Sequence, residues 1–106
     1  MAEFNNVTVT KAASVYFDGM VTSRKVTFAD GSFKTLGIMQ VGDYKFATKE
    51  KELMEILAGE CDILLPETEQ WQTIGAGESF YVPAHSKFEI KAKTLIDYCC
   101  SYLASE

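Results

Sequence analysis

The stretch Gly77-Glu-Ser-Phe-Tyr-Val-Pro-Ala-His-Ser-Lys-Phe88 decides the fold. After its glycine comes a short apolar run over residues 79–82, which ends at Pro83. A second run begins at Phe88 and alternates apolar with polar residues. Alternation with a period of two between glycine and proline is typical of β-strands joined by turns. The stretch therefore predicts two strands separated by a turn that carries His85.

The rest of the chain follows the same period. Asp30-Gly31 stands between two β-branched runs and is a strong signal for a β-hairpin. Residues 53–57 have helical propensity, but Gly59 follows closely and strands surround them, so we predict a strand entered through a charged turn. About ten short strands with frequent turns indicate an all-β sandwich or barrel. Strands are predicted over residues 14–17, 20–28, 35–41, 44–48, 53–57, 61–65, 71–74, 79–82, 88–92 and 95–103.

Length and charge limit the possible classes of protein. A chain of 106 residues, 47% of them hydrophobic, has room for one domain with a real core. We expect residues 1–13 to form an N-terminal arm or edge strand, and residues 14–106 to form the domain. The net charge of -5 argues against binding to nucleic acid, which needs a basic surface, although a few local cations can still hold a small anion.

The cysteines and the apolar runs indicate the compartment. No run approaches the length needed to span a membrane, and the first residues lack the basic region and apolar core of a signal peptide. Cys61, Cys99 and Cys100 are an odd number and a poor framework for disulfides, so a reduced, cytoplasmic setting is predicted. Cys99 and Cys100 are adjacent on a strand, so at most one of them faces the interior of a barrel.

Two segments resemble the motifs of the cupin family. Phe46, Thr48, Glu52 and Gly59 lie where the first cupin motif has its two histidines, its glutamate and its glycine. Phe88 lies where the second motif has its histidine. The resemblance implies a single-domain, cupin-like jelly-roll β-barrel. A transition-metal site needs several nitrogen, oxygen or sulfur ligands at one point, and these residues do not supply them, so no metal is expected.

A longer ordered set of segments resembles the pyrimidine/purine nucleoside phosphorylase family of small bacterial cupins. The resemblance implies a homodimer and a metal-independent pentosyltransferase. Its substrates would be diverse purine and pyrimidine nucleosides, with inorganic phosphate as co-substrate and no cofactor, and its products free base and pentose 1-phosphate. Members often carry a basic residue near Phe33, where this chain has Lys34. The segments are Asp30-Gly-Ser-Phe-Lys-Thr-Leu-Gly-Ile-Met39, Gly42-Asp-Tyr-Lys-Phe46, Glu52-Leu-Met-Glu-Ile-Leu-Ala-Gly59, Phe80-Tyr-Val-Pro-Ala-His-Ser-Lys-Phe88, Tyr98-Cys99 and Tyr102-Leu103.

Phosphorolysis needs an anion subsite, and two polar groups at strand ends are candidates for it. Ser32, Lys34 and Thr35 follow the predicted hairpin turn, and His85 and Ser86 follow Pro83. Hydroxyl groups and cations of this kind bind phosphate. We expect the two groups to meet at one rim of the barrel, with His85 as a catalytic residue because histidine is the residue type best suited to proton transfer at physiological pH.

The nucleoside needs flat apolar walls and a partner for its sugar. Phe46, Phe80, Phe88 and Tyr98 are candidates for the walls around the base, and Thr48 is added to the substrate-binding set. Aromatic stacking tolerates any base, which suits broad specificity. Glu52 is the second predicted catalytic residue, because a carboxylate can bind ribose hydroxyls or stabilise the cationic sugar of the transition state.

Two other functions stay open at this point. One is a cupin that binds a sugar or nucleoside without catalysis, in the same pocket. The other is a metal-dependent cupin enzyme with atypical ligands. The phosphate-binding residues favour phosphorolysis over the first, and metal analysis of the protein separates it from the second.

Overall fold

A computed structural model describes residues 3–103, which form eleven strands in two antiparallel sheets. The prediction of an all-β fold is confirmed. The helical content of the described residues is one short 3-10 turn, η1 (Phe17–Gly19), and no described helix is long and apolar enough to cross a membrane. The strands are β1 (Thr8–Val9), β2 (Ser14–Tyr16), β3 (Val21–Thr27), β4 (Phe33–Met39), β5 (Gly42–Ala47), β6 (Lys51–Ala58), β7 (Glu60–Leu64), β8 (Gln72–Gly75), β9 (Ser79–Val82), β10 (Lys87–Ala92) and β11 (Ile96–Leu103).

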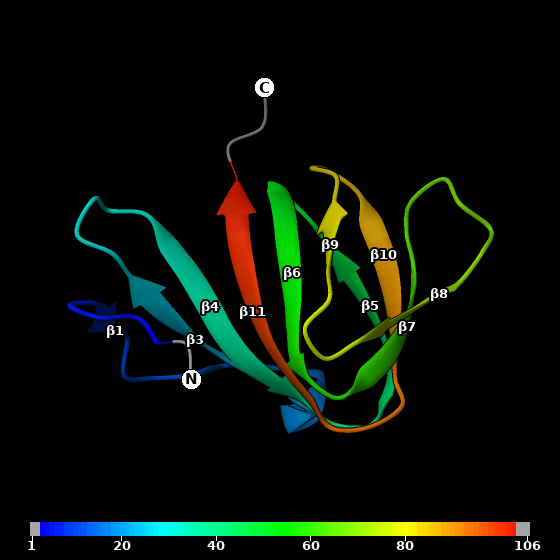
Figure 1. The fold of residues 1–106 in the computed structure, drawn as a ribbon, viewed down its shortest axis with the longest axis horizontal. Helices are drawn as coiled ribbons and strands as arrows, with labels where there is room; N and C mark the ends of the chain where they lie inside the picture. Colours follow the sequence, from blue (N-terminus) through cyan, green and yellow to red (C-terminus); the bar gives the residue numbers. More distant parts are fainter. Residues whose placement is uncertain (1–2, 104–106) are drawn as a thin grey trace.

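The two sheets differ in their number of strands, seven and four. The larger sheet has the order β1-β3-β4-β11-β6-β9, with β2 also paired to β3, and the smaller has the order β5-β10-β7-β8. Figure 1 shows β3 and β4 continuing to the left beyond the four-stranded sheet, which lies behind the right half of the molecule. The core fills the space where the two sheets face each other, around side chains such as Met39, Ile56, Ile63, Ile90 and Val82.

The predicted elements agree with the observed ones except at their ends. Residues 53–57 lie within strand β6, which begins two residues earlier at Lys51, so the choice of strand over helix is confirmed. The Asp30-Gly31 hairpin is also confirmed, since β3 and β4 pair up to Thr27 and Phe33 on either side of it. Phe17 was predicted in a strand, but it begins the 3-10 turn with a backbone φ of 51°.

The predicted N-terminal arm contributes the short strand β1, which pairs with β3 through Thr8 and Val9. Phe4, also in the arm, packs edge-on against Phe28 at 5.2 Å between ring centroids. Residues 1–2 and 104–106 of the predicted arm and domain lie outside the described residues, and the boundary at residue 13 stays a prediction.

Gly59 closes the turn between β6 and β7 in a conformation that only glycine adopts easily. Its φ is +99°, and a Cβ there would overlap the carbonyl oxygen of Leu95 and the hydroxyl of Thr94. Gly31, in the hairpin turn, has a similar φ of +89° but has nothing within 4 Å of the Cβ position. The two glycines therefore separate backbone strain from steric overlap.

We predict that Gly59→Ala lowers the free energy of unfolding by about 2–4 kcal/mol, the sum of left-handed strain and overpacking. Gly31→Ala is the matched control and should cost about 1–2 kcal/mol, from strain alone. Urea unfolding of both variants measures the difference. Equal losses would show that the turn after β6 yields to the new methyl group, contrary to this account of the fold.

Candidate active site

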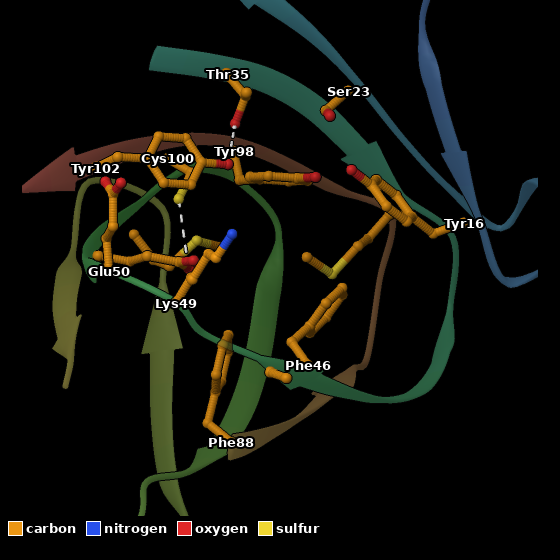
Figure 2. Close-up of a pocket in the computed structure, with 14 residues that line it drawn as sticks. Tyr16, Ser23, Thr35, Phe46, Lys49, Glu50, Phe88, Tyr98, Cys100 and Tyr102 are labelled. Carbon is orange, nitrogen blue, oxygen red and sulfur yellow. Dashed lines mark hydrogen bonds between the residues drawn. The ribbon is translucent and has the colours of Figure 1, made fainter. Parts of the chain in front are cut away.

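A pocket of about 370 Å³ opens between the two sheets. Its lining comes from β2, β3, β4, β6 and β11 of the larger sheet and from β5, β10 and the β5–β6 turn on the other side. Pockets of about 300–1,000 Å³ are typical of small-molecule sites. Figure 2 shows aromatic side chains at the bottom of the view, and tyrosine, threonine, serine and cysteine side chains above them.

The aromatic floor is made by Phe46 and Phe88, the residues at two of the cupin histidine positions. They are directly opposite each other on β5 and β10, and their rings stack with 5.6 Å between centroids and 27° between planes. Phe80, another of the predicted rings, packs against Phe88 with 6.1 Å between ring centroids. It does not line the pocket and therefore belongs to the core. The floor therefore presents a flat apolar surface to the cavity.

The opposite wall depends on strand β11, whose alternate residues Tyr98, Cys100 and Tyr102 face the pocket. Cys99 points to the other face and is buried there, so the prediction that at most one of the two adjacent cysteines faces the interior is confirmed. Cys61, Cys99 and Cys100 are all free thiols. The pairing of β11 with β6 shifts register between Asp97 and Tyr98, where β6 has one extra residue, Leu57.

Glu52 is half-buried beside this wall. Its carboxylate accepts a hydrogen bond of 3.5 Å from the thiol of Cys100, drawn as a dashed line in Figure 2. Burial raises the pKa of Glu52 above its ordinary value; the Cys100 hydrogen bond opposes this rise, and the nearby charge of Glu50 adds to it. Burial also raises the pKa of Cys100, which the Glu52 charge reinforces, so the thiol keeps its proton at neutral pH. The Cys100 thiol is thus a proton donor beside Glu52, whose ionised form is disfavoured by burial.

Hydroxyl groups line the other end of the pocket. Thr35 and Tyr102 share a hydrogen bond of 3.2 Å between their hydroxyls, and the Tyr98 hydroxyl donates to the Thr22 carbonyl at a long 3.5 Å. Ser23 and Tyr16 complete this end. Lys49 also lines the pocket, on the side of Glu50 and Glu52.

The structure brings five of the ten predicted site residues to this pocket: Thr35, Phe46, Glu52, Phe88 and Tyr98. Their roles stay predictions, but their common location makes one site possible. The other five, Ser32, Lys34, Thr48, His85 and Ser86, do not line it.

The predicted anion subsite of Ser32, Lys34 and Thr35 with His85 is not assembled, for two reasons. Successive residues of a strand face opposite sides, so Lys34 lies on the outer face, 5.6 Å from the Phe4 ring, while Thr35 faces the pocket. The Ser32 hydroxyl is engaged in its own turn, donating to the Asp30 carboxylate at 2.6 Å.

His85 lies in a different turn on the far side of the sheet. Strand β9 leads into the turn that contains His85, so Tyr81 on β9 serves to locate that turn. Lys34 on β4 and Tyr81 lie in one row of the larger sheet, with β11 and β6 between them. Three strand spacings of about 4.8 Å therefore separate those two backbones. Figure 1 shows the β3–β4 turn and the β9–β10 turn well apart along the upper edge. His85 is exposed, with a backbone φ of 51°.

Thr48 and Ser86 form a clip that holds the turn containing His85. The Thr48 hydroxyl donates to the Pro83 carbonyl at 2.7 Å, and the Ser86 hydroxyl donates to the same carbonyl at 2.6 Å. The Ser86 backbone N–H donates to the Thr48 hydroxyl at 3.0 Å. These bonds tie β5 to the start of β10 and thereby fix Phe46 and Phe88 at the pocket floor.

The other pocket residues were missed in the sequence, and those with polar side chains or a thiol are Tyr16, Ser23, Lys49, Glu50, Cys100 and Tyr102. The strand period contained the signal for two of them, since Cys100 and Tyr102 share the parity of Tyr98 on β11. Tyr16, Ser23 and Lys49 depend on the pairing of strands and on a turn. Over residues 3–103, no group of three or more histidine, cysteine, aspartate or glutamate side chains is arranged to hold a metal ion.

Comparison with known proteins identifies the family. The model of the pyrimidine/purine nucleoside phosphorylase family matches residues 11–102. A protein called pyrimidine/purine nucleoside phosphorylase from Colwellia psychrerythraea is 71% identical over 104 residues, which cover 98% of this chain and 100% of that protein.

Solved structures agree on the fold. A protein of unknown function (DUF1255) from Acinetobacter sp. ADP1 superimposes with a TM-score of 0.92 at 39% identity, covering 95% of this chain and 98% of that one. A cupin superfamily protein from Desulfitobacterium hafniense superimposes with a TM-score of 0.60 at 20% identity, covering 99% and 84%, and so shares the fold alone. The chain is a cupin-like β-barrel that belongs to the pyrimidine/purine nucleoside phosphorylase family.

Proposed function

We propose that the protein is a pentosyltransferase that cleaves the N-glycosidic bond of purine and pyrimidine nucleosides with inorganic phosphate. The observation that carries the proposal is one pocket in which a stacked aromatic pair faces a half-buried carboxylate and a set of hydroxyls. Membership in the family supports the reaction class.

The aromatic floor suits a base of any identity. Phe46 and Phe88 offer ring faces and no hydrogen-bonding groups, and stacking on a ring face depends weakly on which base is present. A pocket that read the hydrogen-bonding edge of one base would discriminate strongly against others. The floor therefore supports broad specificity for the base.

The carboxylate suits the sugar. In the transition state of glycosidic cleavage, positive charge develops at the anomeric carbon and its ring oxygen. An ionised Glu52 in a partly buried setting stabilises that charge more strongly than a solvated carboxylate does, and it also accepts hydrogen bonds from ribose hydroxyls. Glu52 is therefore assigned to the sugar.

The proposed reaction balances with phosphate as the one co-substrate. A phosphate oxygen forms a bond to the anomeric carbon while the bond from that carbon to the base nitrogen breaks. The electron pair of the broken bond goes to the base, and the proton carried by hydrogen phosphate finishes on the departing base. The products are free base and pentose 1-phosphate, and positioning and fixed hydrogen bonds supply the rate.

A homodimer and a cytoplasmic location remain predictions. The family resemblance is the ground for the first, and the three free thiols are the ground for the second. Sedimentation at micromolar concentration tests the dimer, and a monomer would contradict it.

The function is tested by incubating the protein with inosine or uridine in the presence and absence of phosphate. We expect base release from both nucleosides that requires phosphate and is unchanged by a chelator. Equal release without phosphate would indicate a hydrolase. Binding of nucleoside with no release under any condition would indicate a cupin that only binds, and loss on chelation restored by one metal would indicate a metal-dependent enzyme.

Glu52→Gln is predicted to lower kcat by about a hundredfold, the usual cost of losing one preorganised electrostatic group. Since the carboxylate acts when ionised, kcat/KM of the wild type should fall with decreasing pH as Glu52 takes up its proton. Burial raises the pKa of Glu52, so this acid limb should lie at higher pH than for an ordinary glutamate. A rate that rises as pH falls would show that Glu52 acts as an acid.

The same substitution should stabilise the fold. A raised folded-state pKa means that ionised Glu52 lowers stability above that pKa, and that stability is regained as the pH falls towards the pKa of the unfolded chain. Glu52→Gln should therefore raise Tm at pH 8 and leave it unchanged at pH 4. Glu55→Gln, on the opposite face of β6, is the matched control and should show no such pH-dependent gain.

A further inference from the structure

Four hydroxyl side chains line the pocket on the side of β2, β3, β4 and β11, and they belong to Tyr16, Ser23, Thr35 and Tyr98. Figure 2 shows the oxygens of Tyr16, Ser23 and Tyr98 at the upper right, and that of Thr35 nearer the middle, bonded to Tyr102. We refer to these four residues as the hydroxyl cluster. Ser23 is 7% exposed and Tyr98 is 6% exposed, so two of its polar side chains are more than nine-tenths buried.

Two hydroxyls of the hydroxyl cluster have no protein partner and are accessible from the pocket. Within residues 3–103, the hydroxyls of buried Ser23 and of exposed Tyr16 make no hydrogen bond to protein, and the Tyr98 hydroxyl donates one long hydrogen bond of 3.5 Å to the Thr22 carbonyl. Buried polar groups in proteins are usually satisfied by protein, water or ligand. Burial raises the pKa of Tyr98, so its hydroxyl keeps its proton and stays a donor at neutral pH.

Gly37 positions Tyr98 in the hydroxyl cluster. Ser23, Gly37 and Tyr98 form one row across β3, β4 and β11. A Cβ at Gly37 would overlap both the Tyr98 hydroxyl and the Thr22 carbonyl. The missing side chain therefore lets the tyrosine ring lie across β4, which carries its hydroxyl from β11 to the side of β3.

Charged groups are unevenly placed around the pocket. Glu50, Glu52 and Lys49 line the end away from Ser23 and Tyr16, so two carboxylates and one ammonium group lie there. Lys25 lies two residues beyond Ser23 on the same face of β3, directly opposite Thr35. Its ammonium group is 4.3 Å from the centre of the Phe33 ring, which in turn packs on Tyr102 at the pocket wall. Lys25 therefore does not line the pocket, but its positive charge lies outside it on the side of Thr35 and Tyr102.

We propose that the hydroxyl cluster binds inorganic phosphate and so orients the attacking oxygen toward a sugar held by Glu52. This assignment rests on the proposed phosphorolysis and gives its co-substrate a location. Hydrogen bonds from neutral donors to a charged phosphate oxygen are among the stronger ones in proteins. The predicted group of Ser32, Lys34 and His85 is replaced in this role, because those side chains lie outside the pocket.

Conservative variants test the assignment. Ser23→Ala and Tyr98→Phe each remove one hydroxyl, and each should raise KM for phosphate about tenfold or more, the effect of one hydrogen bond to a charged group. KM for the nucleoside should change by less than about twofold, because the hydroxyl removed in each variant is proposed to contact phosphate and not the nucleoside. Phe46→Leu should do the reverse, raising KM for the nucleoside and leaving that for phosphate unchanged.

Tyr81→Phe and Lys34→Met are the controls, since both side chains lie away from the pocket, and neither should change KM for phosphate. Phosphate binding is measured separately as the rise in Tm at constant ionic strength, which should be seen in the wild type and lost in Ser23→Ala. An unchanged KM for phosphate in folded Ser23→Ala and Tyr98→Phe would overturn the assignment, as would a rise in nucleoside KM instead. If wild-type protein releases no base with phosphate, the proposed function fails, and the Tm measurement alone decides whether the hydroxyl cluster binds phosphate.

Discussion

The site depends on the hydrogen-bonded pairing of β11 with β4 on one side and β6 on the other. The register sets Tyr98 opposite Gly37, Cys100 opposite both Thr35 and Met54, and Tyr102 opposite Glu52. A slip of one residue would turn every one of these side chains to the other face of the sheet. The two flanking ladders therefore place the carboxylate and the hydroxyls in the same cavity.

The pocket has aromatic rings at positions where cupins have metal ligands. In place of metal-binding histidines, this chain has a stacked phenylalanine pair that presents a flat apolar surface to the cavity. The glutamate of the motif remains, but it now meets a protonated thiol in a partly buried setting. Burial of Glu52 raises its pKa, so the ionised carboxylate lowers the stability of the fold. The proposed function uses that charge on the sugar.

Local pattern was enough to predict much of the fold and part of the site. Period-two alternation and the glycine turns predicted the strands, including β6 despite its helical propensity, and the motif spacing located Phe46, Glu52 and Phe88. The prediction of one anion subsite from Lys34 and Thr35 was wrong because neighbours on a strand face opposite ways. That error was avoidable from the strand period alone.

Other features depend on contacts that a single sequence does not reveal. Ser23 and Tyr16 reach the pocket because β3 pairs with both β4 and β2, and Tyr98 reaches them because Gly37 leaves room. The hydroxyls of Thr48 and Ser86 donate to the Pro83 carbonyl in the β9–β10 turn, a contact that residue type alone does not predict. Long-range register and the partners of polar side chains require the structure.

The central claim is that phosphate itself attacks the sugar in this aromatic pocket, and product analysis with phosphate labelled with ¹⁸O tests it most directly. Attack by a phosphate oxygen on the anomeric carbon leaves all phosphorus–oxygen bonds intact. The account predicts pentose 1-phosphate that retains the full label, together with an equal amount of free base from either inosine or uridine. Free pentose in place of the labelled ester would contradict it, because water and not phosphate would then be the nucleophile.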